Sequence, residues 1–222
     1  MFPLRDDRPT WSPPVVTTLL IVACALVFFF ELSLDEYSRD YFINRYGVVP
    51  AHLRPVTLFT SLFLHGGWMH IIGNMLFLWA FGKSLEDAMG HTKFLMFYLV
   101  CGIAAGITHV VFNLYTTLPT LGASGAIAGV MGAYLVKFPK AKIHTLFFLF
   151  FFFTTTDIPA FLILIYWFIT QLFSEYGAIT QTQVMNGGVA YAAHIGGFVT
   201  GMILVQFMGV RTRYLPRRQV YW

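Results

Sequence analysis

Residues 122–136 read GASGAIAGVMGAYLV, an apolar helix that opens with a serine between two glycines. Small residues such as Gly, Ala and Ser are typical of transmembrane helices, because they allow neighbouring helices to pack closely. Other apolar segments contain His70 and Asn74, four residues apart, and His194. Polar and ionisable side chains are costly within a bilayer and are therefore candidates for function. A serine, an isolated histidine and a His/Asn pair are the groups that an acyl-transfer site requires.

The composition of the chain indicates a membrane protein. Apolar residues make up 57% of its 222 residues and charged residues only 11%, whereas soluble domains have about 25% charged residues. This length accommodates about six spans of roughly 20 residues, and we expect no soluble domain. The net charge of +4 does not indicate nucleic-acid binding, because the charges lie in loops and tails. Cys24 and Cys101 lie in apolar stretches, which predicts buried thiols rather than a disulfide or a metal site.

Six membrane spans are predicted from the apolar segments, the second and fourth with additional flanks. They are Val15–Leu32, Met69–Phe81, Phe94–Phe112, Ala123–Val136, Ile158–Phe173 and Val189–Met208. The segment Ile143–Phe153 is too short to cross about 30 Å of hydrocarbon, so we expect an interfacial or re-entrant piece. The predicted fold class is an all-α polytopic membrane protein, with an N-terminal tail (1–14), a membrane domain (15–209) and a basic C-terminal tail (210–222).

The distribution of basic residues predicts the orientation of these spans. One side of the membrane would collect Arg5, Arg8, Lys83, Lys93, Lys137, Lys140, Lys142, Arg211, Arg213, Arg217 and Arg218, and the other only Arg39, Arg45 and Arg54. Basic loops are retained in the cytoplasm, so both termini are predicted to be cytoplasmic. In this topology, Ser124, His194, His70 and Asn74 lie at a similar depth below the non-cytoplasmic surface.

Rows of small residues predict how spans four and six meet. The glycines that we assign to close helix packing are Gly122, Gly125, Gly129, Gly197 and Gly201. Such rows allow two backbones to approach closely, which would bring the short side chain of Ser124 within hydrogen-bonding reach of His194. We assign the glycines to packing and not to chemistry.

A structural role has to be weighed for each candidate residue. A serine within a membrane helix usually serves packing, but Ser124 stands at a helix N-terminus, where free N–H groups favour negative charge. A buried histidine is also more often structural. We interpret His109 and His144 as structural residues or as neighbours of lipid headgroups, and His65 as forming a structural hydrogen bond under the first loop. His194 differs, because its neighbours along the chain are almost all apolar. Since no acidic residue lies near the outer ends of spans two, four or six, a Ser-His dyad is predicted rather than a triad.

Five stretches of the chain together match one family. They are Thr60–His70 (TSLFLHGGWMH) continuing to Asn74, Gly122-Ala123-Ser124-Gly125, Ala193-His194-Ile195-Gly196-Gly197, Glu86–Gly90 and Ile158-Pro159-Ala160. On these residues the chain resembles the rhomboid intramembrane serine proteases of the minimal six-span bacterial type, over roughly residues 45–208. A lone G-x-S-G motif would be weak, whereas the combination is specific.

The resemblance implies a six-helix bundle with a long, partly membrane-embedded first loop. It implies that Ser124 is the nucleophile and His194 the general base, and that His70, Asn74 and the Ser124 backbone N–H stabilise the oxyanion. A substrate helix would enter laterally between spans two and five and be cut near the outer leaflet, with neither a metal nor a cofactor. One stretch departs from the family pattern, because Leu53-Arg54-Pro55-Val56 lacks the Trp-Arg pair common in the first loop.

The sequence therefore predicts an intramembrane serine endopeptidase that cleaves single-span or polytopic membrane proteins. We expect a multi-pass protein of a bacterial inner membrane, in contact with the lipid bilayer and not with nucleic acid. Two alternatives remain open. An inactive rhomboid-like protein that binds membrane clients would lack the serine or the histidine, and this chain has both. A small transporter should show repeated halves or broken helices, and the chain has no internal repeat.

Overall fold

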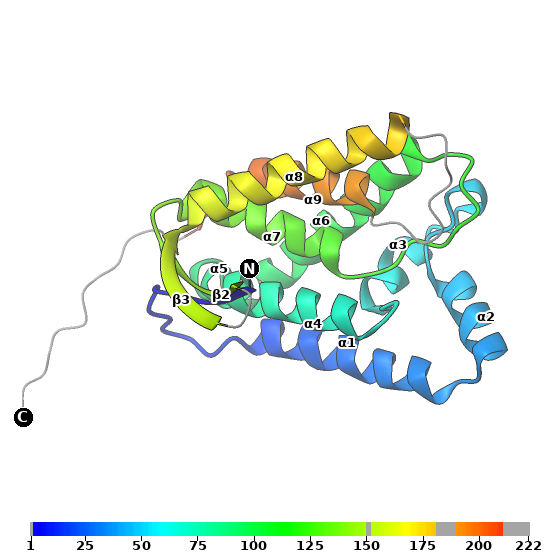
Figure 1. Cartoon of the computed structure of the whole chain (residues 1–222), viewed down its shortest axis with the longest axis horizontal. Helices are drawn as coiled ribbons and strands as arrows, with labels where there is room; N and C mark the ends of the chain where they lie inside the picture. Colours follow the sequence, from blue (N-terminus) through cyan, green and yellow to red (C-terminus); the bar gives the residue numbers. More distant parts are fainter. Residues whose placement is uncertain (1, 150–151, 181–189, 211–222) are drawn as a thin grey trace, which may run out of the picture.

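The computed structural model describes residues 2–149, 152–180 and 190–210, and in this part of the chain the fold is a bundle of helices with a small sheet at one end (Figure 1). By length and composition, three helices can cross a membrane: α1 (Val15–Ser33), α6 (His91–Phe112) and α8 (Ala160–Thr180). The shorter apolar helices α7 (Ser124–Lys137) and α9 (Tyr191–Leu204) complete the bundle with the second predicted span. The predicted polytopic helical architecture is thus confirmed.

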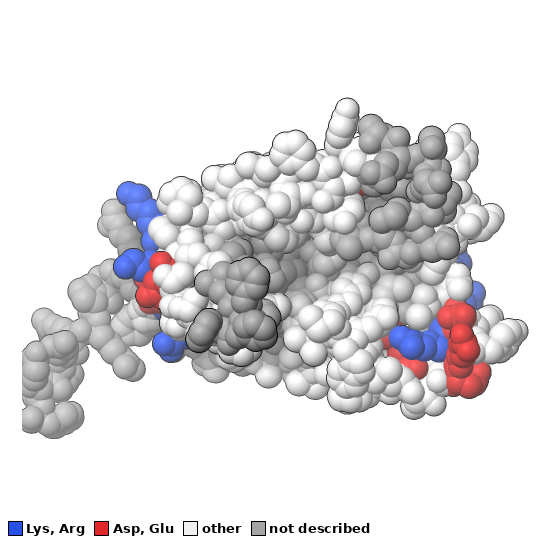
Figure 2. Space-filling model, in the orientation of Figure 1, with Lys and Arg blue, Asp and Glu red and all other residues white. Residues whose placement is uncertain are grey.

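The second predicted span is built from three consecutive helical pieces. These are α4 (Trp68–Phe77), a π-helical turn (Leu78–Gly82) and α5 (Lys83–Met89). On the face seen in Figure 2, nearly all of the charged side chains lie at the two ends, and the described surface between them is almost free of charge. This distribution is the one expected of a protein whose middle contacts lipid.

The long first loop contains α2 (Glu36–Tyr46), a 3₁₀ turn (Pro50–His52), α3 (Thr57–Thr60) and a second 3₁₀ turn (Ser61–Phe63). Backbone hydrogen bonds anchor it, among them one of 3.0 Å from the Ala51 N–H to the Thr116 carbonyl. Val48 and Thr120 exchange hydrogen bonds of 2.8 and 2.7 Å, and the Gly122 N–H donates to the Ser61 carbonyl at 2.9 Å. The loop that lacks a Trp-Arg pair is therefore held through its backbone to the segment that precedes Ser124.

A three-stranded antiparallel sheet at one end of the bundle was not predicted (Figure 1). Its strands are β1 (Phe2–Asp6), β2 (Lys142–Leu149) and β3 (Phe152–Pro159), in the order β1-β2-β3. The segment Ile143–Phe153, which we expect to be an interfacial or re-entrant piece, supplies residues of two strands, and its position relative to the membrane stays a prediction. Its aromatic and β-branched residues favour strands. The sheet also takes up residues 2–6 of the predicted N-terminal tail, whereas residues 211–222 of the C-terminal tail lie outside the described residues.

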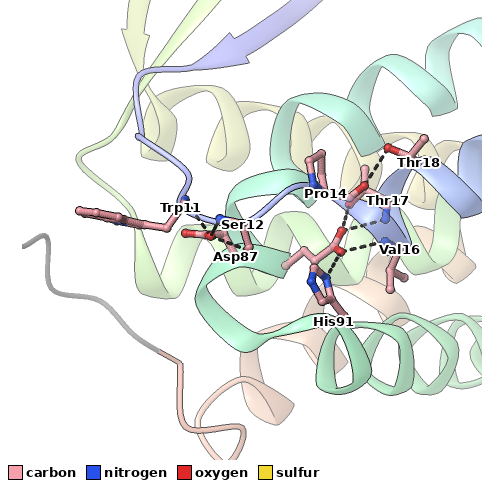
Figure 3. Close-up of polar contacts among 9 residues, drawn as sticks. Trp11, Ser12, Pro14, Val16, Thr17, Thr18, Asp87 and His91 are labelled. Carbon is pink, nitrogen blue, oxygen red and sulfur yellow. Dashed lines mark hydrogen bonds and ion pairs between the residues drawn. The ribbon is translucent and has the colours of Figure 1, made fainter. Parts of the chain in front are cut away.

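The first span is fixed by a buried carboxylate from α5. The Glu86 carboxylate accepts hydrogen bonds from the backbone N–H groups of Val16 and Thr17, both at 2.8 Å, and from the Thr17 hydroxyl at 2.7 Å. The N–H groups of the first helical turn have no partner within the helix, so Glu86 satisfies them from another span. His91 Nδ1 lies 2.6 Å from the same carboxylate (Figure 3).

Candidate active site

Ser124 and His194 lie in direct contact, although 70 residues separate them in the sequence. Ser124 is the first residue of α7, and its Oγ lies 2.7 Å from His194 Nε2 on α9. His194 is buried, with 8% of its surface exposed, whereas Ser124 is half-buried. A hydroxyl hydrogen-bonded to an imidazole is the arrangement in which the imidazole can remove the hydroxyl proton.

The glycine rows explain why α7 and α9 can approach so closely. A Cβ at Gly201 would collide with the backbone carbonyl of Gly129, and a Cβ at Gly197 with that of Gly125. The predicted packing role of these glycines agrees with these contacts. Because α7 is buried along most of its length, the position of Ser124 is set by the core of the bundle.

Gln171 on α8 completes the surroundings of the histidine, and sequence reasoning missed it. Its Oε1 lies 2.7 Å from His194 Nδ1, so the imidazole is bonded at both nitrogens. The indole of Trp167, one turn earlier on α8, packs against the same ring at a centroid distance of 5.6 Å. The signal for Gln171 is present in the sequence, because it is a polar side chain within a largely apolar span.

His70 and Asn74 lie beside the segment that leads into Ser124. A Cβ at Gly122 would lie 2.7 Å from His70 Nε2 and 3.6 Å from Asn74 Nδ2, so both side chains face this glycine. Gly122 has φ +121°, a conformation that favours glycine. The Asn74 amide nitrogen is buried and has no hydrogen-bond partner among the described residues. All four predicted site residues are thus brought to one region of the bundle.

The N–H of Gly66 points at His70 Nδ1, at 3.4 Å. In a neutral imidazole with an acceptor at Nδ1, the proton resides on Nε2. His70 therefore presents an N–H donor toward Gly122, next to the amide donors of Asn74.

Three other histidines are engaged in local contacts: His109 and His65, which are buried, and His144, which is partly exposed. His109 Nε2 lies 2.7 Å from the Thr120 hydroxyl, and His144 Nδ1 lies 2.9 Å from Asp157 across the sheet. His65 Nδ1 lies 3.2 Å from the Phe63 carbonyl, which is the hydrogen bond expected under the first loop. Burial lowers the pKa of His65 to about 4, so it is neutral at pH 7.

Among the described residues, no group of three His, Cys, Asp or Glu side chains is arranged to hold a metal ion. Cys24 and Cys101 are buried, and both are free thiols.

Comparison with known proteins agrees with this geometry. The family model of the rhomboid domain matches residues 52–211, which is most of the chain and includes all four predicted site residues. The chain belongs to the rhomboid family. With its apolar helices, this makes it an integral membrane protein.

Several relatives are similar to this chain. Rhomboid protein 1, mitochondrial, of Saccharomyces cerevisiae is 32% identical over 157 residues, 67% of this chain and 40% of the relative. The rhomboid protease GluP of Bacillus subtilis is 33% identical over 136 residues, 59% of this chain and 25% of the relative. The putative rhomboid protease YdcA of the same organism is 34% identical over 128 residues, 55% of this chain and 61% of the relative. The matched segments thus span less than two thirds of each relative.

Proposed function

We propose that this protein is an intramembrane serine endopeptidase that uses a dyad of Ser124 and His194. The observation that carries the proposal is the 2.7 Å contact between Ser124 Oγ and His194 Nε2 at the N-terminus of a buried helix. One relative is named a rhomboid protease and another a putative rhomboid protease, and these names point to the same activity. The motifs that distinguish an active member from an inactive client-binding relative, the serine and the histidine, are both present.

The proposed reaction has two steps. His194 Nε2 takes the proton of Ser124 Oγ as the oxygen attacks a substrate carbonyl, and a C–O bond forms. The tetrahedral intermediate collapses when the C–N bond breaks, and the protonated imidazole gives its proton to the leaving amine. Water, with His194 again acting as base, then hydrolyses the acyl-enzyme and restores the serine.

The developing oxyanion requires donors that are already in place. Asn74 offers an amide nitrogen without a partner among the described residues, and His70 offers an Nε2–H beside Gly122. The backbone N–H of Ser124, at the start of α7, adds the favourable end of a helix dipole. Donors that need no rearrangement at the moment of reaction account for much of the catalytic effect in other serine enzymes.

The proposed substrates are membrane-spanning helices that are opened near the non-cytoplasmic surface. A backbone carbonyl in an intact helix is hydrogen-bonded, and in hydrocarbon each lost bond costs several kcal/mol. Ser124 can therefore attack only where the substrate helix unwinds, which favours a small residue such as Ala at the cut with Gly or Pro nearby. We place both termini and the sheet on the cytoplasmic side of a bacterial inner membrane, because most basic residues of the predicted loops and tails lie on that side.

The test is cleavage of a single-span substrate by the purified full chain in liposomes, together with labelling of Ser124 by a fluorophosphonate. Ser124→Ala and His194→Ala should each abolish cleavage, because residues that act as a unit fail together. His144→Ala is the matched control, since His144 pairs with Asp157 in the sheet outside the site, and it should cleave normally. Cleavage that survives in Ser124→Ala would refute the dyad, and binding of the substrate without any cleavage by the unaltered protein would favour a client-binding role.

A further inference from the structure

A polar side chain from a third helix contacts the proposed general base. Gln171 lies on α8, is 9% exposed, and places Oε1 2.7 Å from His194 Nδ1. We propose that Gln171 is a positioning residue that holds His194 in the Nδ1-protonated tautomer. This inference rests on the proposed function and deepens it, because it assigns the dyad a third, neutral member.

The direction of the Gln171 amide follows from its other contacts. Its Nε2 lies 3.4 Å from the Trp167 carbonyl oxygen and 3.2 Å from the Thr170 hydroxyl. A carbonyl oxygen only accepts hydrogen bonds, and the Thr170 hydroxyl already donates to the same carbonyl at 2.6 Å. Rotating the amide by 180° would place its oxygen against that carbonyl and leave two acceptors without a proton. The amide oxygen therefore faces His194.

This orientation determines where the imidazole proton resides. An amide oxygen cannot donate, so His194 Nδ1 must carry the proton that forms the 2.7 Å bond. In a neutral imidazole the other nitrogen, Nε2, then has a lone pair. That lone pair lies 2.7 Å from Ser124 Oγ and is ready to accept the serine proton. The alternative tautomer would present an N–H to the serine and could not act as its base.

Gln171 and Trp167 act on His194 from the same face of α8. They are four residues apart, which places them one above the other on a helix, and the Trp167 ring lies at 38° to the imidazole. The amide fixes the rotation of the ring and the position of its proton, and the indole packs against the ring in a tilted arrangement. The orientation of the base therefore depends on the packing of α8 against α9.

The expected effect is smaller than that of a triad aspartate. A wrong tautomer costs about 10⁴-fold when that carboxylate is replaced, whereas outer partners of metal-bound histidines are worth about 10- to 100-fold. A neutral amide adds no charge to stabilise the imidazolium, so we expect the lower range. Removing the acceptor should lower kcat by about 10- to 100-fold and leave KM nearly unchanged, because Gln171 acts on the base.

The experiment compares four proteins in liposomes with a single-span substrate. Gln171→Met removes the acceptor with little change of volume, and Gln171→Glu keeps an acceptor at the same place. Tyr166→Phe, an exposed position on α8, controls for loss of a polar group from this helix. We expect Gln171→Met to lose kcat as stated, Gln171→Glu to retain most of it, and Tyr166→Phe to match the unaltered protein. Equal kcat in Gln171→Met and the unaltered protein would overturn the proposal, and so would equal losses in Gln171→Met and Gln171→Glu.

A second readout separates this inference from the proposed function. Imidazole ¹⁵N spectra, with the His194 signals assigned by their absence in His194→Ala, report the tautomer without any turnover. The Nδ1-protonated form should dominate in the unaltered protein and give way to a mixture in Gln171→Met. An unchanged tautomer would refute the role of Gln171 even if Ser124 is the nucleophile. Conversely, a tautomer shift in a protein that cleaves nothing would leave Gln171 as a positioning residue and refute the protease.

Discussion

Replacing Glu86 by alanine should destabilise the protein strongly, because this buried carboxylate joins α5 to the start of α1. Three donors on α1 reach it at 2.7–2.8 Å: the Val16 and Thr17 N–H groups and the Thr17 hydroxyl. Figure 3 shows Val16, Thr17 and His91 converging on this point. After truncation, all three donors would be left inside the protein without an acceptor.

The magnitude follows from these contacts. A hydrogen bond to a charged group contributes about 1.5–3 kcal/mol, and a buried donor left unsatisfied costs about 1–3 kcal/mol. Three such donors set an upper limit near 9 kcal/mol, but relaxation and entry of water reduce it. Breaking a buried charge interaction costs about 3–5 kcal/mol in other proteins, and we expect this range for Glu86→Ala. That is a large part of a typical folding free energy of about 5–15 kcal/mol.

Asp87, the next residue, provides a matched control. Its Oδ1 also accepts three hydrogen bonds, from the Trp11 and Ser12 N–H groups and the Ser12 hydroxyl, at 2.7–2.9 Å. These groups are only partly buried, so water can replace the carboxylate, and Asp87→Ala should cost about 1 kcal/mol. The free energy of unfolding is measured by denaturant titration in mixed micelles. A Glu86→Ala cost below about 1 kcal/mol, or one equal to that of Asp87→Ala, would refute the argument from burial.

Two further predictions concern packing and pH. Gly201→Ala should destabilise the protein by about 1–3 kcal/mol or more, because the new methyl group meets the backbone of Gly129. A Cβ at Gly73 would have nothing within 4 Å, so the control Gly73→Ala should be neutral or slightly stabilising. Thermal unfolding measures both effects. Burial lowers the pKa of His65 from 6.5 to about 4, so below pH 6.5 the unfolded chain binds a proton that the folded protein excludes. The free energy of unfolding should therefore fall between pH 6.5 and 4, by up to about 3 kcal/mol from this group. In His65→Gln the melting temperature should depend less on pH. An unchanged pH dependence in that variant would contradict the low pKa of His65.

The helices and the meeting of Ser124 with His194 could be predicted because both follow from local patterns. Apolar length determines which segments can span a membrane, and the structure has α1 and α6 within a few residues of the predicted bounds. The rows that contain Gly129 and Gly201 predict close approach of two helices, and the two backbones do meet at these residues. Charge asymmetry and motif spacing then place the candidate groups at one depth without any knowledge of side-chain contacts.

The sheet could not be predicted in the same way, because its register depends on contacts that are distant in sequence. Pro3 pairs with Thr145, and Asp6 with Ile143. The residues before α1 are few and partly polar, and they carry no signal that a strand lies opposite them. The hydrophobic run at 143–153 indicates a membrane-associated segment, but apolar content alone does not distinguish a short strand from a short helix.

Gln171 shows the same limit at the active site. An amide within an apolar span is detectable in the sequence, since such a group needs a partner in a membrane. Its partner is not detectable, because helix periodicity says which residues share a face of α8 and nothing about which face of α9 meets it. Only the packed structure places Oε1 2.7 Å from His194 Nδ1 and the Trp167 ring beside the imidazole. The absence of a nearby carboxylate predicts a dyad, but it leaves the second imidazole nitrogen unassigned. A buried Nδ1–H requires an acceptor, and this requirement makes a neutral third residue the natural complement of a serine-histidine pair in lipid.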